Sequence, residues 1–387
     1  MKILIHGRFY PSVGGIETVI NLLAREWAAA GHEPVVVSNL AGIPPPGRPF
    51  PFRVIYTPGP SAWWHLVKSA DVVLHLNISL KALWPHFLLR RPLIISHQSC
   101  YKPYRSYSSY SRSWRERLKL CCTSGATNIA ASHAIARALD IPCKVIPNPY
   151  DSTVFIQPTT PPRDRDLIFV GRLVSEKGVD LLLTGMKYLE PPWNTARLTI
   201  IGDGPQRASL QNQATKSGVA SQVDFLGTLD PHSVARELRR HKILVIPSVY
   251  EEPFGVVALE GAASGCVVLG SDGGGLPEAI GPAGALFRRG DPVDLASQLL
   301  RLLRADSEFP RQPHAAVADH LKRHHPAQIA SEYLKVFHRL QPKPRKAELR
   351  EALIPFPANP AWSHSPVPSG PREARPSKVY QGRPCQN

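Results

Sequence analysis

Two glutamates stand eight positions apart in the segment EEPFGVVALE, residues 251–260. The apolar residues after Gly255 predict a buried helix, so we expect Glu260 near a core and Glu252 in the loop before the helix. An unpaired carboxylate in a core is costly, and the two hydroxyls of a ribose would satisfy it. Helical rise separates the two carboxylates by roughly 10 to 12 Å, too far for a pair that acts on one bond. We therefore expect the acids to hold different parts of one extended ligand. The alternative is a surface glutamate and a buried one that pairs with an arginine.

Two cations follow a predicted strand at residues 167–172. Arg172 and Lys177 stand five positions apart in GRLVSEKG, across a loop that leads into a helix. A guanidinium binds phosphate oxygens in bidentate fashion and an ammonium acts as a point charge, so the pair could hold a diphosphate. The alternative is two solvated surface cations, and the position directly after a buried strand favours binding.

Glycines occur at two further strand ends. Gly14 and Gly15 follow the predicted strand 2–7 and precede a helix, whose N-terminal NH groups favour a phosphate. An ordinary strand-to-helix turn also uses glycine, and this alternative stays open. Gly202 and Gly204 could bring the backbone close to a nucleobase or ribose, although the three-glycine spacing of a dinucleotide site is absent.

Strand-like runs alternate with helical patterns along most of the chain, which predicts an α/β fold with two Rossmann-like, doubly wound domains that face a central cleft. Many of the strands are continuously apolar, as in parallel sheets buried on both faces. We predict strands at residues 2–7, 34–39, 71–76, 92–97, 127–132 and 144–149, then at 167–172, 197–204, 223–227, 243–248 and 266–271. The predicted parts are an N-terminal domain at 1–157, a linker at 158–166, a second domain at 167–325, an amphipathic helix at 326–340 and a disordered, Pro-rich basic tail at 341–387.

The amino-acid composition limits the classes of binding partner that we expect. The 387 residues carry a formal charge of +16, which attracts phosphates, nucleic acid or anionic lipid. No nucleic-acid module accompanies the basic residues, so no nucleic-acid partner is expected. Six cysteines without a C-x-x-C motif and the absence of a signal-peptide pattern favour a cytoplasmic protein. Charged and polar residues interrupt the apolar stretch 72–95, so any membrane contact is expected to be peripheral, at the inner face.

Five motifs together resemble one family. FYPSVGGIE, GRLVSEKG, IGDGP, EEPFGVVALE and GGGLPEAI occur in the order and approximate spacing of the retaining GT-B glycosyltransferases of family four, the "glycosyl transferase group 1" enzymes. The resemblance covers roughly residues 1–340, and its most specific motif is the E-x7-E element. It implies a nucleotide-diphosphate-sugar donor bound by the second domain and an acceptor bound by the first, with the helix 326–340 crossing back to the first domain.

The resemblance also implies roles for single residues, by motif position. Arg172 and Lys177 would neutralise the diphosphate leaving group, and Gly15 would offer its NH to the distal phosphate. Glu260 would hold the ribose, and Glu252 would contact hydroxyls of the transferred sugar. His97 in IISHQS would contact the donor sugar near the reacting centre. Phe254 and Gly255 would start the helix that faces the diphosphate. The resemblance implies transfer with retention of the anomeric configuration. Transfer would need neither metal nor cofactor, because preorganised cations and NH groups stabilise the charge on the leaving diphosphate. The acceptor would be a glycan or lipid-linked hydroxyl, in cell-surface polysaccharide or glycolipid synthesis by a hexosyltransferase.

Some segments depart from the family or add to it. PNPYD at 147–151 stands where the family commonly has Asn-Gly, and the tail has no counterpart. The segment 101–122 interleaves Tyr and Trp with Arg and Lys, which suits an anionic membrane interface or a polyanionic acceptor; a solvated loop is the alternative.

Other functions remain open at this point. A sugar-nucleotide epimerase shares the architecture and would turn over donor without an acceptor. A catalytically silent sugar-nucleotide-binding subunit would bind donor without transfer.

Overall fold

The structure is a computed structural model of the 387-residue chain. It describes residues 1–10, 14–42, 50–89, 91–99, 119, 121–156, 163–305 and 315–340. All of them belong to one unit, Met1–Gln341. The predictions for the tail at 341–387, and for most of the segment 101–122, lie outside the described residues.

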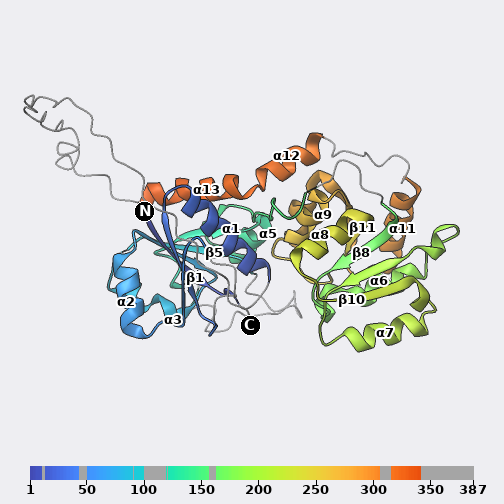
Figure 1. The fold of residues 1–387 in the computed structure, drawn as a ribbon, viewed down its shortest axis with the longest axis horizontal. Helices are drawn as coiled ribbons and strands as arrows, with labels where there is room; N and C mark the ends of the chain where they lie inside the picture. The colour runs from blue at the N-terminus through green and yellow to red at the C-terminus, as the bar shows by residue number, and fades with distance from the viewer. Residues whose placement is uncertain are drawn as a thin grey trace, which may run out of the picture. The chain divides into compact units, whose positions relative to one another are not determined.

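The first half of the chain builds a parallel sheet of seven strands in the order β3-β2-β1-β4-β5-β6-β7 (Figure 1). Its strands are β1 (Lys2–Gly7), β2 (Glu33–Ser38), β3 (Arg53–Tyr56), β4 (Val72–Leu76), β5 (Leu93–His97), β6 (Thr127–Ala130) and β7 (Lys144–Val145). The order reverses direction between β1 and β4, as in a doubly wound fold.

The second half builds a parallel sheet of six strands in the order β10-β9-β8-β11-β12-β13. Its strands are β8 (Arg165–Val170), β9 (Leu198–Ile201), β10 (Val223–Gly227), β11 (His241–Ile246), β12 (Val267–Ser271) and β13 (Gly284–Phe287). Here the reversal lies between β8 and β11, so the loops that follow these two strands leave the same edge side by side.

Helices cover both sheets. With the first sheet lie α1 (Gly15–Ala29), α2 (Pro60–Ser69), α3 (Leu80–Leu83), the 3-10 turn η1 (Trp84–Phe87), α5 (His133–Leu139) and α13 (Pro326–Leu340). The remainder are η2 (Ser175–Lys177), α6 (Val179–Met186), η3 (Trp193–Thr195), α7 (Arg207–Lys216), η4 (Ala220–Gln222), α8 (Pro231–Arg240), α9 (Val256–Ala263), α10 (Leu276–Ile280), η5 (Gly281–Ala283), α11 (Pro292–Arg304) and α12 (Ala315–Arg323).

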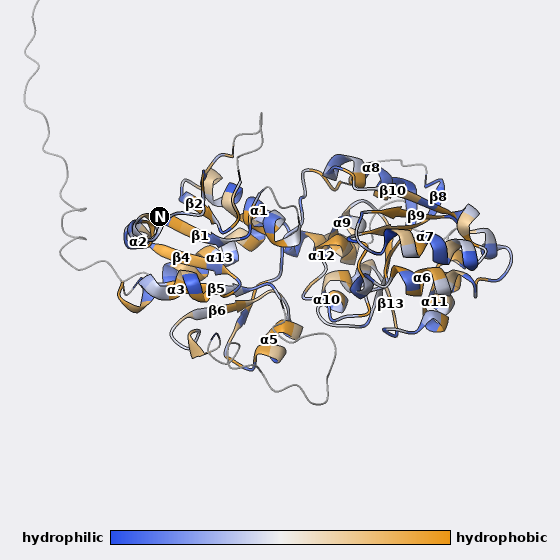
Figure 2. Ribbon diagram, turned by 90° about the horizontal axis from the view of Figure 1, so that it is seen from below, coloured by the Kyte–Doolittle hydropathy of each residue, from blue (hydrophilic) through white to orange (hydrophobic). Residues whose placement is uncertain are grey.

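The strands are apolar on both faces because a core lies on each side of each sheet. In β1, Ile3 and Ile5 face the core shared with α1 and α13, whereas Leu4 faces the core under α2. In β11, Ile243 likewise faces one core and Leu244 faces the core on the other side of the sheet. Figure 2 shows the result as hydrophobic strands between helices with hydrophilic outer faces.

The last described helix, α13, packs on the first sheet's side, next to α1 (Figure 1). Its bounds are those that the amphipathic pattern predicts, residues 326–340. Tyr333 and Phe337 are buried against Trp27, whose Nε1 donates to the Ala330 carbonyl at 3.1 Å. Apolar burial therefore attaches the end of the described chain to the core formed by its beginning.

Two strands escape prediction from the sequence, β3 and β13. Each forms an edge of its sheet and is only partly buried, so its sequence lacks the continuous apolar run of a central strand. A third difference is the start of β8 at Arg165, inside the predicted linker 158–166. Arg165 pairs in register with His241 of β11, which extends the strand into a polar stretch.

In the described part of the chain, no helix combines the length and apolarity that crossing a bilayer requires.

Candidate active site

A buried ion pair joins two of the predicted site residues. Lys177 Nζ lies 2.6 Å from Glu252 Oε1, and Glu252 is only 5% exposed. The hydroxyl of Ser248 donates to the same carboxylate oxygen at 2.6 Å, and that of Tyr250 donates to Oε2 at 2.6 Å. A carboxylate with three donors is fixed in position, which preorganises it toward a ligand.

The charges of this cluster are set by its contacts. Burial alone would raise the pKa of Glu252, but Lys177, Ser248 and Tyr250 outweigh burial and lower it below its usual range. The same surroundings act on Tyr250, whose pKa is raised by burial and then by the charge of Glu252. Lys177 also stands over the Tyr250 ring, 5.2 Å from its centroid. At neutral pH the carboxylate of Glu252 is therefore ionised and the phenol of Tyr250 is neutral.

Three loops that leave neighbouring strands bring these residues together. Lys177 ends η2 after β8, and the NH of Val249, after β11, donates to the Glu176 carbonyl at 3.0 Å. From the loop after β12, the Gly275 NH donates to the Glu252 carbonyl at 2.7 Å. Because β8, β11 and β12 are adjacent, the cluster lies at the carboxyl edge of the second sheet, where open α/β folds bind ligands.

Arg172 lies in the first of these loops, with an exposed side chain. Its charge acts to lower the pKa of Tyr250, so the guanidinium lies near the cluster. Gly202 and Gly204 support this loop: a Cβ on Gly202 would stand 1.8 Å from the Gly171 carbonyl oxygen, and one on Gly204 would stand 2.4 Å from that of Leu173. The two glycines therefore bring one backbone against another, a use that the sequence analysis did not predict.

The predicted turn into a helix is confirmed at Gly255. This residue caps α9 with φ +98, a conformation that side-chain-bearing residues rarely adopt, and Phe254 before it is 2% exposed. The turn places Glu252 in the loop and Glu260 in the second turn of α9. Glu252 is itself buried, which the sequence analysis did not predict, while the residue Glu260 is intermediate in exposure and its carboxyl group is enclosed by protein. The three donors allow the Glu252 carboxylate to be buried.

Glu260 differs from Glu252 in having no donor. Among the residues that the structure describes, no side chain or NH group hydrogen-bonds its carboxylate. Burial, with a smaller contribution from Asp151, raises the pKa of Glu260 to about 7. A ligand that supplies two hydroxyl donors would satisfy this group, which agrees with the predicted ribose contact.

At the first sheet, the predicted glycines flank the start of α1. Gly14 is its N-cap residue, and a Cβ on Gly14 would stand 2.9 Å from Glu17 Oε2. Gly15 is the first helical residue, and a Cβ there would meet nothing within 4 Å. The space around Gly15 is compatible with the predicted phosphate contact, which stays a prediction.

His97 ends β5, as predicted, but it is fully buried. Its Nε2 lies 3.0 Å from Asn128 Oδ1, and burial lowers its pKa, so the ring is neutral. A contact of His97 with a donor sugar would require that the ring become accessible, and it stays a prediction.

A buried polar network beside His97 was not predicted. The Gln98 side chain donates to Ser96 Oγ at 2.9 Å and accepts from Asn148 at 2.7 Å, and Ser96 Oγ lies 2.8 Å from the Tyr333 hydroxyl. Asn148 belongs to the PNPYD segment. Only the polar ending of an apolar strand, SHQS, could have indicated this network.

Ser248 and Tyr250 were also missed. Both lie in the segment IPSVYEE: Ser248 ends the predicted strand 243–248, and Tyr250 lies between that strand and Glu252. Their position just before a candidate acid at a strand end is the signal that could have identified them. Among the described side chains, no group of three or more His, Cys, Asp or Glu is arranged to hold a metal ion.

Comparison with known protein families shows to which family this chain belongs. The family described as "Glycosyltransferase Family 4" matches residues 13–154, and the one described as "Glycosyl transferases group 1" matches residues 152–317. The chain belongs to the group 1 glycosyltransferases. The second match contains the whole Lys177 and Glu252 cluster, and the first contains the strand that ends at His97.

Curated relatives of this glycosyltransferase family differ widely in what their names state. An uncharacterized glycosyltransferase of Methanocaldococcus jannaschii is 41% identical over 118 residues, 30% of each chain. A glycogen synthase of Mycobacterium tuberculosis is 37% identical over 162 residues, 41% of this chain and 38% of its own. One subunit of the phosphatidylinositol N-acetylglucosaminyltransferase of Arabidopsis thaliana is 25% identical over 324 residues, 76% of this chain and 72% of its own. The matched part thus spans less than two fifths of the first two relatives.

Solved structures confirm the GT-B fold. Anabaena HepE, solved with UDP and glucose, matches with a TM-score of 0.71 at 19% identity, over 88% of this chain and all of that one. The sucrose-phosphate synthase of Thermosynechococcus elongatus matches with a TM-score of 0.70 at 20% identity, over 88% of this chain and 98% of that one. At these identities the likeness concerns the fold.

Proposed function

We propose that this group 1 glycosyltransferase transfers a sugar from a nucleotide-diphosphate-sugar donor to an acceptor hydroxyl, with retention of the anomeric configuration. The observation that carries the proposal is the ion pair of Lys177 with Glu252, fixed by Ser248 and Tyr250 at a strand edge next to Arg172. The two cations, Lys177 and Arg172, would stabilise a departing diphosphate, and the carboxylate of Glu252 would bind hydroxyls of the sugar.

In this proposal the cations act on the leaving group. Lys177 is paired with the Glu252 carboxylate in the structure. A diphosphate that binds beside Lys177 would interact with the same ammonium as Glu252. Arg172 has an exposed guanidinium that can bind two phosphate oxygens. Negative charge grows on the diphosphate as the sugar leaves, so both cations stabilise the transition state more than the bound donor. Transfer would then proceed without metal or other cofactor.

The carboxylates orient the donor. Glu252 is ionised and immobile, and it would accept hydrogen bonds from hydroxyls of the transferred sugar. Glu260, without a donor among the described residues, would accept from the ribose. Gly15 would approach the distal phosphate, and His97 would contact the donor sugar. Both contacts follow the family's motif positions.

The acceptor would be a glycan or lipid-linked hydroxyl, bound by the first domain. A lipid acceptor is supported by the Arabidopsis relative, which is named as a subunit of phosphatidylinositol N-acetylglucosaminyltransferase. The reaction would belong to cell-surface polysaccharide or glycolipid synthesis, at the cytoplasmic face of a membrane. The basic aromatic segment 101–122 would help to recruit the acceptor.

The test is a reaction of the purified chain with UDP-, GDP- and ADP-sugars, in the presence of lipid extracts or oligosaccharides. We expect one donor to be consumed, with a product whose anomeric proton has the configuration of the donor by NMR. An inverted product contradicts retention. A nucleotide sugar that changes configuration without transfer identifies an epimerase, and donor binding without turnover identifies a silent binding protein.

A further inference from the structure

Apolar side chains face solvent between α3 and β5. Trp84 is 38% exposed, and Phe87 and Leu88 are each 70% exposed, more than any other large apolar side chain of the described residues. Trp84 stacks on Trp64 of α2, with ring centroids 5.6 Å apart and 12° between the planes. We call these four residues the α3–η1 patch. Burying such side chains is favourable, so their common exposure indicates a binding surface.

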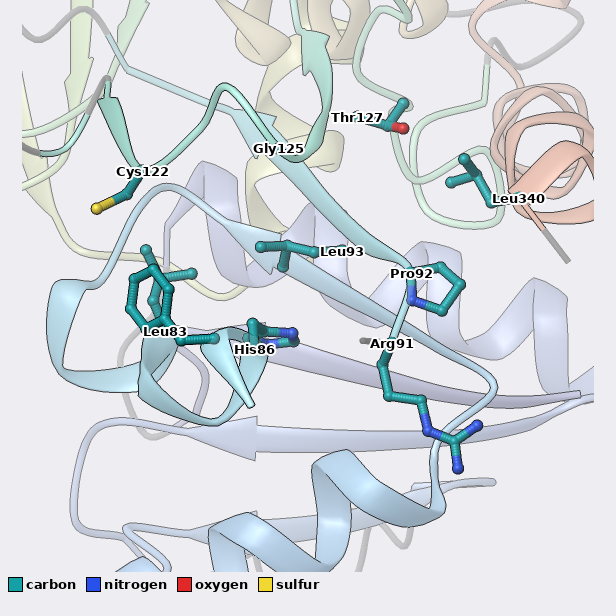
Figure 3. Close-up of a pocket in the computed structure, with 10 residues that line it drawn as sticks. Leu83, His86, Arg91, Pro92, Leu93, Cys122, Gly125, Thr127 and Leu340 are labelled. Atoms are coloured by element: carbon teal, nitrogen blue, oxygen red, sulfur yellow. The ribbon is translucent and has the colours of Figure 1, made fainter. Parts of the chain in front are cut away.

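A pocket of about 430 Å³ shares Phe87 with the patch. Figure 3 shows side chains that line this pocket. Its lining includes Leu83, Phe87, Leu93 and Leu340, together with His86 and Arg91. Figure 3 shows the Arg91 side chain extending away from Leu93, and its Nη2 donates to the Lys68 carbonyl of α2 at 2.6 Å. This bond fixes a guanidinium at the rim of the apolar surface.

The stretch of sequence that contains Trp84, Phe87 and Leu88 carries charge of one sign. Between Asp71 and Glu116 the sequence contains no acidic residue. The basic residues of this interval are Lys81, Arg90, Arg91, Lys102, Arg105, Arg112 and Arg115. Lys81 and Arg91 of this interval are exposed in the structure, and so is Lys68 of α2. A partner of this surface must therefore accept apolar side chains and carry negative charge.

We propose that the α3–η1 patch docks on the surface of an anionic phospholipid bilayer. Phe87 and Leu88 would enter the boundary between headgroups and acyl chains, with Trp84 at the headgroup level. Lys68, Lys81 and Arg91 would lie against the anionic headgroups. An uncharged apolar partner would explain the exposed side chains, but it would leave the exposed cations Lys68, Lys81 and Arg91 without a counterpart. The proposal does not depend on the transfer reaction.

The test is co-sedimentation of the full chain with vesicles of phosphatidylglycerol and phosphatidylcholine in equal amounts, and with vesicles of phosphatidylcholine alone. We expect binding to the mixed vesicles and little to the neutral ones. The double variant Phe87→Ser/Leu88→Ser should bind the mixed vesicles about tenfold more weakly, because it removes two inserting side chains. Lys68→Glu/Lys81→Glu should weaken binding by a similar factor.

Matched controls lie in the second half of the chain. Tyr188→Ser/Val293→Ser also removes an aromatic and an aliphatic side chain, which are 50% and 57% exposed. Lys187→Glu/Lys216→Glu also reverses two exposed cations. We expect wild-type binding from both controls, with thermal melting to show that all four variants are folded.

Three results would overturn the proposal. One is that the wild type binds neutral and anionic vesicles equally, or binds neither kind. Another is wild-type binding by Phe87→Ser/Leu88→Ser. The third is loss of binding on charge reversal at Arg112, Arg115 and Lys119 while both patch variants still bind, which would assign the docking to the basic segment 101–122.

Discussion

The carboxyl edges of the two sheets share a topology but differ in the state of their polar residues. At the second sheet, Lys177 and Glu252 are charged, and Arg172 is exposed beside them. At the first sheet, His97 is fully buried, and burial lowers its pKa. Ser96 and Gln98 bond there to other buried side chains.

The difference indicates that the same sheet edge serves ligand binding in one half of the chain and structural stability in the other. Charged groups that face a ligand suit a substrate with its own charge, such as a nucleotide diphosphate. Neutral groups that satisfy one another stabilise a scaffold, and in the proposed function the loops that follow the strands recognise the acceptor. The comparison makes four predictions, which follow from the largest expected effect to the smallest.

Lys177→Ala should lower the transfer rate on the order of 10³-fold, because it removes a cation that stabilises the departing diphosphate. It should also lower the free energy of unfolding by about 3 kcal/mol, since it leaves Glu252 buried without its partner. Kinetic assays and chemical denaturation measure the two effects. The matched control is Lys242→Ala, which breaks a partly buried pair with Asp166 in the same domain. Similar rates in the two variants would mean that Lys177 serves stability alone.

Three buried histidines should make the first sheet's domain sensitive to acid. Burial lowers the pKa of His6 and of His86 to about 4, and that of His75 well below 6.5. Each binds a proton more readily when unfolded, so stability is complete above pH 6.5 and is lost as the pH falls toward 4. For His6 this loss is roughly 3 kcal/mol. Denaturation at pH values from 7 to 4 measures it. His86→Leu should lower the slope, and an unchanged slope would show that the histidines are not its cause.

Donor binding should depend on the ionisation of Glu260. Its pKa of about 7 lies above the usual value of 4.5, and hydroxyls of a ribose would donate to the ionised form. The affinity for a nucleotide sugar should therefore rise by about tenfold from pH 6 to pH 8 and then level off. Glu260→Gln should bind more weakly, with no dependence on pH in this range. Titration calorimetry measures both, and the same pH profile in the two proteins would remove Glu260 from the donor site.

Tyr333→Phe should affect stability alone. It removes the hydroxyl that lies 2.8 Å from Ser96 Oγ in the core, at a cost of about 1 kcal/mol. Donor affinity should stay at the wild-type value, because the network belongs to the scaffold. Thermal unfolding and donor titration measure the two quantities, with the exposed Tyr188→Phe as control. A loss of donor affinity in Tyr333→Phe would show that this network positions groups of the donor site.

The sequence predicts the central parts of both sheets because buried parallel strands are continuously apolar, as β1 and β11 are. It fails at the edge strands β3 and β13, which are half-buried and have mixed sequences. For the site, strand ends and spacing identify Lys177 and Glu252. Spacing cannot show that Ser248 and Tyr250 stabilise the buried carboxylate, since that depends on how three loops meet. Nor can it show that Gly202 and Gly204 contact a neighbouring loop.

The central claim is that the cluster around Lys177 and Glu252 binds the diphosphate of a sugar nucleotide. The most direct measurement is calorimetric titration of UDP-, GDP- and ADP-sugars into the wild type, Lys177→Ala and Lys242→Ala. We expect one donor to bind the wild type and Lys242→Ala with the same affinity, and Lys177→Ala at least about tenfold more weakly. Equal affinities in all three proteins, or no binding by any donor, would contradict the account.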